Sequence, residues 1–386
     1  MVTGRLDVLL VTVFTVVLLV DLVRQFLVGD ISFPFIASVV LEGLVIGLAY
    51  GLAGIGLSMT YSILNFANFA HGDTITAGAF AGWSVAYVVG GFGTAGLGSL
   101  FLLTADPGIS IANAFLVVVV GGVAAGLGAV ALSLLLDRIV YKPMRNAGGI
   151  ALLIASIGVA LALRYVIAFV YGTGVKGITA PVPKVTFLAV NGVTGFGVIN
   201  PDQQVGQLGS VSELPFFVDL PFAASGSQVL VSLTFHGLAL AVTAAGLMLA
   251  MHLLLQRTKL GKAMRAMADN KPLARVTGIP TERVIRMTWI LGGALTGIAG
   301  FLIVLESGTM SFSFGWLLLL FVFAAVILGG IGSIYGAMVG GVIVGLVDSI
   351  AIIWIPSGLT KAAAFAVLIV VLLIRPEGIF GGVTTA

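Results

Sequence analysis

Long apolar stretches follow one another along most of this chain of 386 residues, and they constrain its fold more than any other feature. Hydrophobic residues make up 59% of the chain and charged residues only 9%. Soluble domains carry roughly 25% charge. Several runs reach about 20 residues without alternating polar positions, which suits helical spans and excludes barrel strands. The sequence therefore predicts an all-α polytopic membrane protein.

The expected spans have lengths that match the hydrocarbon core of a bilayer. They are residues 8–28, 36–63, 74–98, 112–136, 150–171, 228–255, 284–306, 316–332, 334–354 and 361–374. We expect about eight to ten transmembrane helices in a single transmembrane domain over residues 1–386. Arg5 precedes the first run and no small-residue cleavage site follows it, which predicts a retained signal anchor.

Basic residues are unevenly distributed between the expected loops. The block 257–286 holds eight of the 18 Lys and Arg residues, offset only by Asp269 and Glu282. The positive-inside rule places this block, and with ten spans both chain termini, in the cytoplasm. This topology also explains the formal charge of +3, so no nucleic-acid partner is expected.

The longest segment between spans, residues 172–228, carries five prolines and lies outside the membrane in this topology. Two interpretations stay open. The segment is either a cap that meets a soluble partner or a tolerated insertion.

The chain has 53 glycines, and several recur at every fourth position. Small residues at this spacing let helix backbones approach closely where lipid surrounds them. The pattern predicts a tight Gly-rich helical bundle. The residues concerned are Gly43, Gly47, Gly51, Gly336, Gly340, Gly341 and Gly345.

The segment 61–73, YSILNFANFAHGD, interrupts an apolar stretch with Asn65, Asn68, His71 and Asp73. Irregular backbone at membrane depth usually lines a cavity, so the segment is a candidate for the translocation pathway. The alternative is a turn that faces water, with Asp73 and Thr74 capping the next helix.

Four isolated ionisable residues fall inside expected spans: Glu42, Arg164, Glu306 and Asp348. Each is costly in lipid unless it is paired or faces an aqueous cavity. They form either a proton or ion site, or a structural pair between an Arg and a carboxylate, or interfacial contacts.

Motifs for catalysis, cofactors and metals are missing from the sequence. There are no cysteines, and His71, His236 and His252 lack paired metal-ligand spacing. The pair Gly261-Lys262 is followed by Ala263, and Gln256 stands where a P-loop requires glycine. If the protein uses ATP, another chain must bind it.

Within the basic block, a helix is expected over 263–268, with a break at Asn270 and Pro272. Gly278 ends a second short helix, and together the two form a compact knob. Two other interpretations stay open: a charged loop that only fixes topology, or an amphipathic helix on anionic membrane lipid.

Four motifs resemble those of branched-chain amino acid ABC transporter permeases of the LivH-like type. The pattern G-K-A-M-R-A-x-A-x-N over 261–270, continued by L-A, G-I and R-V-I up to residue 285, is similar to their cytoplasmic coupling loop. The runs NFAHGD at 68–73, LGGIGSIYGAMVGG at 328–341 and RPEGIFG at 375–381 also match. The chain departs from the family pattern at 271–274, where it reads KPLA instead of an acidic residue and two alanines.

The resemblance implies the permease subunit of an ABC importer for branched-chain or related small amino acids. It also implies a second homologous permease subunit, two ATP-binding cassette subunits and an extracytoplasmic substrate-binding protein. The protein would be a multi-pass protein of the cell membrane and not itself an enzyme. Other amino acids, amides or urea stay open as substrates.

From the resemblance we expect one set of residues to couple the chain to the ATPase and a second set to line the pathway. The coupling set is Gly261, Arg265, Ala266, Asn270 and Gly278; the pathway set is Asn65, Asn68, His71, Gly72 and Asp73. Two rivals stay open. One is an ion-coupled secondary transporter of a small polar solute with Glu42, Glu306 or Asp348 as its proton site, and the other is a membrane scaffold or sensor.

Overall fold

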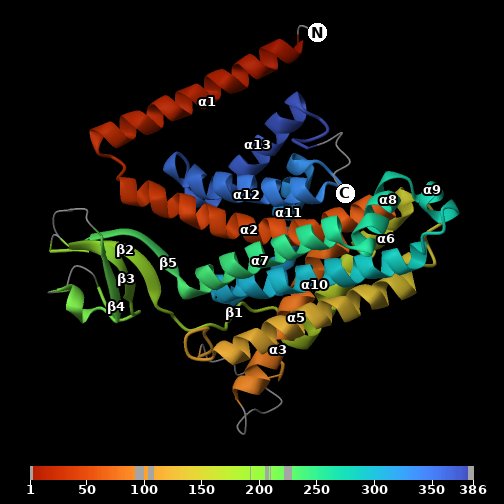
Figure 1. Cartoon of the computed structure of the whole chain (residues 1–386), viewed down its shortest axis with the longest axis horizontal. Helices are drawn as coiled ribbons and strands as arrows, with labels where there is room; N and C mark the ends of the chain where they lie inside the picture. The colour runs from red at the N-terminus through yellow and green to blue at the C-terminus, as the bar shows by residue number, and fades with distance from the viewer. Residues whose placement is uncertain are drawn as a thin grey trace.

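The computed structural model describes residues 3–91, 100–102, 108–191, 193–204, 208, 210–220 and 228–380. Long helices form an elongated bundle that carries a β-sheet at one end and two short helices at the other (Figure 1). The long helices are α1 (Thr3–Val28), α2 (Phe33–Leu64), α3 (Ala70–Gly90), α5 (Phe115–Leu136), α6 (Gly149–Tyr171), α7 (Phe235–Arg257), α10 (Thr281–Ser307), α11 (Phe314–Gly329), α12 (Ile334–Ile350) and α13 (Thr360–Ile374).

The helical membrane architecture predicted from the sequence is confirmed. Among the described residues, seven helices are long and apolar enough to cross a membrane, and α11 is a shorter apolar helix. The predicted start of a span at residue 228 is wrong, because residues 228–234 form a strand. The span predicted over 74–98 begins earlier, at Ala70, and its predicted end lies outside the described residues. Helix α7 begins only at Phe235, where Thr234 caps it by accepting a hydrogen bond from the Gly237 amide at 2.8 Å.

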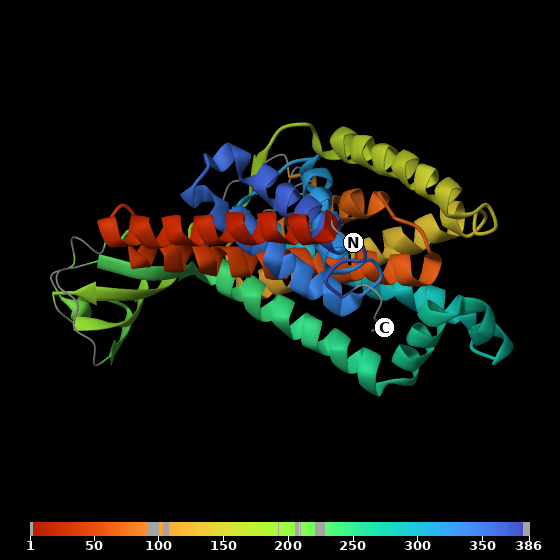
Figure 2. The same ribbon diagram turned by 90° about the horizontal axis from the view of Figure 1, so that it is seen from above.

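The segment between α6 and α7 folds into an antiparallel sheet, which the sequence analysis did not anticipate. Its strand order is β4-β3-β2-β5. The strands are β2 (Lys184–Val190), β3 (Val193–Ile199), β4 (Phe216–Leu220) and β5 (Gln228–Thr234). The sheet has its own small core of Leu188, Val190, Ile199, Leu208 and Leu214. Figure 2 shows it beyond the first turn of α2, at what we call the sheet end of the bundle. Short strands β1 (Lys176–Gly177) and β6 (Thr309–Met310) pair nearby.

Glycines bring α2 and α12 into direct backbone contact. A Cβ atom added at Gly47 would lie 2.8 Å from the Cα atom of Val342, and one at Gly43 would lie 3.0 Å from the Gly345 carbonyl oxygen. A Cβ atom added at Gly345 of α12 would overlap the Cα atom of Gly47. Side chains therefore do not fit at Gly47 or Gly345, and the crossing requires glycine on both helices. This contact explains the four-residue glycine spacing on the two helices.

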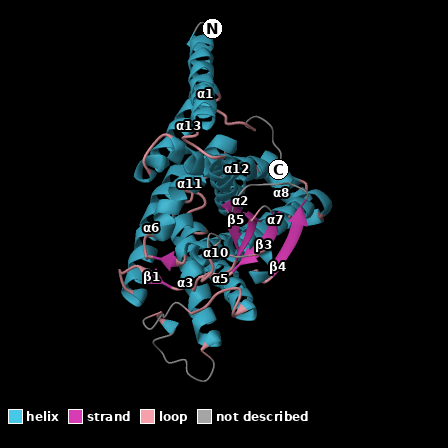
Figure 3. Ribbon diagram, turned by 90° about the vertical axis from the view of Figure 1, so that its left-hand side faces the viewer, coloured by secondary structure: helices cyan, strands magenta, loops and turns pink. Residues whose placement is uncertain are grey.

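Helix α10 runs through the middle of the bundle and contacts α2, α3, α5 and α7 (Figure 3). In its most apolar window 78% of the residues are buried, the largest share among the seven candidate spans. Helix α10 therefore connects the two ends of the molecule. Its first turn lies beside the short helices and its last turn beside the sheet.

Candidate functional site

Residues 65–69 separate α2 from α3; the side chains of Phe66 and Asn68 are buried, whereas Asn65 is exposed. Asn65 ends α2 in the left-handed region with φ of 56°. The Oδ1 atom of Asn68 accepts hydrogen bonds from the Ala70 amide and the Tyr141 hydroxyl, both at 3.1 Å. Helix α3 thus begins at Ala70, and the expected capping by Asp73 and Thr74 is wrong because both lie inside its first turns.

The next residues fix α3 against its neighbours. The Nε2 atom of buried His71 lies 3.0 Å from the Ala53 carbonyl oxygen on α2 and 3.4 Å from Thr296 Oγ1 on α10. A Cβ atom at Gly72 would lie 2.6 Å from the Gly315 carbonyl oxygen, so this glycine allows α11 to approach. The break between α2 and α3 is therefore a packed junction.

Asp73 forms a buried ion pair with Arg164 of α6. The Nε and Nη2 atoms of Arg164 donate to the two carboxylate oxygens of Asp73, each at 3.0 Å. The guanidinium also lies 4.4 Å from the ring of Trp316 on α11. Two charges removed from water require each other, so this pair ties three helices together. The structural interpretation of Arg164 is confirmed.

At the opposite end from the sheet, α8 (Lys259–Asp269) and α9 (Lys271–Val276) form the knob, which we define as residues 258–279. Thr258 caps α8 by accepting from the Gly261 amide at 3.0 Å. A Cβ atom at Gly261 would lie 2.5 Å from the Leu255 Cα atom, so the sharp turn from α7 requires glycine. The two predicted helices are confirmed, although α8 starts four residues earlier than expected.

The break and the end of the knob also follow the sequence prediction. Asn270 Oδ1 accepts from the Leu273 amide at 3.0 Å and caps α9. Gly278 ends the segment with φ of 87°. Ala266 packs on the core, and Arg265 Nη1 donates to Gln256 Oε1 at 3.0 Å across the turn. The five predicted coupling residues therefore mainly determine the shape of the knob.

Two apolar side chains that the sequence analysis did not single out project from the knob. Leu273 is 59% exposed and Val276 is 85% exposed. They are three residues apart and so share a face of α9. The sequence could have indicated this exposed apolar pair, because the two residues stand at helical spacing inside a strongly basic segment.

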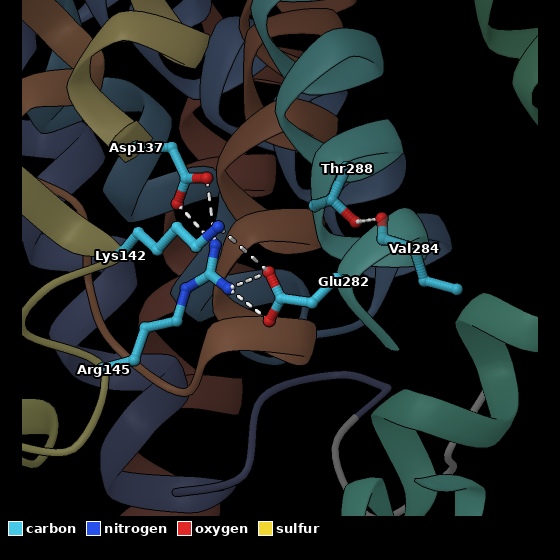
Figure 4. Close-up of polar contacts among 6 residues, drawn as sticks. All are labelled: Asp137, Lys142, Arg145, Glu282, Val284 and Thr288. Atoms are coloured by element: carbon cyan, nitrogen blue, oxygen red, sulfur yellow. Dashed lines mark hydrogen bonds and ion pairs between the residues drawn. The ribbon is translucent and has the colours of Figure 1, made fainter. Parts of the chain in front are cut away.

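A second missed feature is an ion-pair bracket beside the knob (Figure 4). Arg145 donates through Nη1 to Glu282 at 2.6 and 2.8 Å, and through Nη2 to Asp137 at 2.8 and 2.9 Å. Asp137 begins η1 (Asp137–Tyr141), a π-helical turn that ends α5, and Glu282 lies in the first turn of α10. The sequence analysis did not single out Arg145.

The bracket also lies close to the knob and to the junction before α3. Burial lowers the pKa of the Lys271 ammonium at the start of α9, and the positive charge of Arg145 lowers it further. Tyr141 stacks on Trp289 with ring centroids 5.2 Å apart, and its hydroxyl reaches Asn68. The residues around the bracket therefore lie near the knob and contact the predicted pathway segment through Asn68.

Two cavities open at the sheet end. Cavity A has a volume of about 470 Å³ and is lined by Glu42, Glu306 and Lys184 among others. Cavity B has a volume of about 370 Å³ and includes Asp348 and Lys361 in its lining. They share three wall residues: Ile46, Ile303 and Ser307. Three of the four isolated ionisable residues, Glu42, Glu306 and Asp348, thus line these cavities.

Comparison with known proteins defines the family. The model of the family described as "Branched-chain amino acid transport system / permease component" matches residues 39–374. The chain belongs to this permease family. It is 27% identical over 350 residues to the high-affinity branched-chain amino acid transport system permease protein LivH of Escherichia coli K12, covering 91% of this chain and 97% of that protein.

Other relatives of the permease family agree. The permease protein BraD of Pseudomonas aeruginosa is 27% identical over 340 residues, covering 88% of this chain and 94% of BraD. The probable LivH of Methanocaldococcus jannaschii is 27% identical over 341 residues, covering 86% and 88%. No solved structure matches the chain. The resemblance drawn from the motifs is confirmed, and the matched range contains the junction before α3, the knob and the lining residues of both cavities except Ser38.

Proposed function

We propose that this chain is the membrane-spanning permease subunit of an ABC importer for branched-chain or closely related small amino acids. A second homologous permease, two ATP-binding cassette subunits and an extracytoplasmic substrate-binding protein complete the system. The observation that carries the proposal is the knob, a rigid pair of short helices on a permease whose sequence has no P-loop. Family membership supports the substrate class.

The surface of the knob suits docking to another protein. Val276 and Leu273 are apolar and exposed, and Lys262 and Arg275 are exposed charges on the same short helices. Burying the two apolar side chains in a groove of an ATPase subunit would stabilise the complex at roughly 25 cal/mol per Å². Arg265 and the residues that shape the turns would hold this surface in place.

Movement of the docked knob would reach the bundle through the Arg145 bracket. The bracket joins the end of α5 to the start of α10, and α10 extends to the cavities at the sheet end. Coupling of this kind needs an element with two arrangements that the ATPase biases. We propose that the first turn of α10 moves with the knob as one body.

The charge distribution sets the proposed orientation. The knob and both termini face the cytoplasm and the sheet faces outward, where a substrate-binding protein would deliver solute. Phe196 and Val218 pair across β3 and β4 and are about half exposed, which gives such a protein an apolar surface to contact. The pathway role of Asn65, Asn68, His71, Gly72 and Asp73 stays a prediction, supported by their place at a break between helices.

Copurification tests the proposed function. The tagged chain is extracted from its native membrane in mild detergent, and the proteins that accompany it are identified by mass. We expect an ATPase with a P-loop and a second permease. A control chain with Val276→Glu and Leu273→Glu should retain the second permease and lose the ATPase. Recovery of the chain without any ATPase would contradict the proposal.

A further inference from the structure

The charged groups that line cavities A and B have no ion-pair partner of their own. Five salt bridges join side chains within 4.0 Å in the described part of the chain, and none of them involves a charged residue of either cavity. The charged residues concerned are Glu42, Glu306 and Lys184 in cavity A and Asp348 and Lys361 in cavity B. Each cavity therefore offers both a carboxylate and an ammonium to a ligand.

The carboxylate of Glu306 is held in position at the wall of cavity A. Thr234 Oγ1 donates to Glu306 Oε2 at 2.7 Å while it accepts from the Gly237 amide at 2.8 Å. The carboxylate consequently lies at the N-terminus of α7, whose partial positive charge favours an anion there. Glu306 is thus preorganised on the sheet side of the bundle.

Cavity B contains an acceptor that the protein leaves unsatisfied. The Oδ1 atom of Asp348 is buried and has no hydrogen-bond partner among the described residues. Buried acceptors are usually paired, so an unpaired carboxylate oxygen beside a cavity indicates a missing donor. Lys361 lines the same cavity.

An aliphatic wall separates the two charged clusters. Ile46 of α2 and Ile303 of α10 line both cavities. Leu240 adds to the apolar lining of cavity A, and Leu318 and Phe321 add to that of cavity B. Ligand pockets in proteins commonly have volumes of about 300 to 1,000 Å³, and both cavities fall within this range. The lining combines apolar surface with two acids and one base in cavity A, and with one acid and one base in cavity B.

We propose that cavities A and B are successive binding sites for a zwitterionic amino acid with an aliphatic side chain. In cavity A, Glu306 accepts from the ammonium of the solute and Lys184 faces its carboxylate. In cavity B, Asp348 and Lys361 take these two roles. The solute side chain rests on Ile46 and Ile303, which both sites share. This proposal depends on the proposed function and names the residues that would contact the solute.

The test uses the complete transporter in liposomes with ATP inside and labelled leucine outside. The variants are Glu306→Gln and Asp348→Asn, which keep size and remove charge. The matched control is Asp202→Asn, an exposed carboxylate of the same end outside both cavities. We expect about a tenfold fall in leucine uptake in each variant, the size expected for loss of one charged hydrogen bond, and no change in the control.

Binding of labelled leucine to the same liposomes, without ATP and without the substrate-binding protein, separates the two proposals. Parallel loss of binding and uptake supports the site. Wild-type behaviour of both variants overturns the site and leaves the proposed function intact. If the wild type takes up no leucine, the proposed function fails. If, in addition, the wild type does not bind leucine, or the variants bind it as well as the wild type does, the site is overturned too. Glu306→Asp and Asp348→Glu keep the charge and should retain leucine binding. If Glu306→Gln or Asp348→Asn fails to assemble, the corresponding charge-retaining variant is measured instead.

Discussion

The guanidinium of Arg164 on α6 donates two hydrogen bonds of 3.0 Å to the carboxylate of Asp73 on α3, whose side chain is completely buried. Removing one partner would strand a charge inside the bundle. We expect Arg164→Leu to lower the free energy of unfolding by about 3 to 5 kcal/mol. The double replacement with Asp73→Leu should recover much of this loss. Thermal unfolding in detergent measures both.

A matched control for this pair is Arg24, which bonds exposed Asp21 three residues earlier in α1. Arg24→Leu should leave the unfolding temperature nearly unchanged, because water and salt already screen this pair. If Arg164→Leu and Arg24→Leu had equal effects, the buried pair would not hold α3 and α6 together.

The bracket around Arg145 predicts that Arg145→Leu lowers the stability of the protein more than Glu282→Gln does. Asp137 is 13% exposed and Glu282 is 61% exposed. Arg145→Leu leaves Asp137 buried without a partner and should cost about 3 to 5 kcal/mol. Glu282→Gln removes only the exposed arm and should cost less than about 1 kcal/mol. Chemical unfolding of the two variants side by side measures both free energies of unfolding. A larger loss in Glu282→Gln than in Arg145→Leu would contradict the contacts described for the bracket.

Contact between α2 and α12 depends on glycine. In Gly47→Ala the new methyl group meets the α12 backbone at 2.8 Å, which should destabilise the bundle by about 1 to 3 kcal/mol. Gly246→Ala on α7 is the control, since nothing lies within 4 Å of its added methyl group. The unfolding temperatures of the two variants test this prediction. Equal unfolding temperatures for Gly47→Ala and Gly246→Ala would show that α2 and α12 separate easily.

Arg265 tests the role of the knob in coupling. Arg265→Glu breaks the contact with Gln256 and reverses a charge on α8. We expect the amount of solute moved per ATP to fall roughly tenfold or more, as for Arg anchors at interfaces, while the chain stays folded. Arg138→Glu, an exposed residue of η1 outside the knob, should couple normally. Normal coupling in Arg265→Glu would exclude this residue from the mechanism.

The sequence predicted the spans, the glycine contacts and the two helices of the knob because each depends on local spacing. Lipid requires long apolar runs, and caps such as Asn270 and Gly278 act on their own neighbours. The pairing of Arg164 with Asp73 could not be predicted in this way, because 91 residues separate them. Only the fold brings α3 and α6 together.

Other features were missed for identifiable reasons. The bracket was missed because Arg145 and Glu282 lie 137 residues apart, and only the fold brings them together. The sheet was missed because β3 contains Gly195 and Gly197, where a regular strand pattern requires side chains. Glu42, Glu306 and Asp348 were recognised as unusual, but only the cavities show what they face.

The central claim is that this permease moves solute only with an ATPase partner. The direct measurement is uptake of labelled leucine into liposomes that contain the chain, its permease partner and the ATPase subunits, with the substrate-binding protein outside. It is compared with uptake into liposomes that lack the ATPase. We predict uptake that requires ATP and the ATPase and is indifferent to an imposed proton gradient. Uptake driven by a proton gradient without the ATPase would contradict the account and favour an ion-coupled transporter.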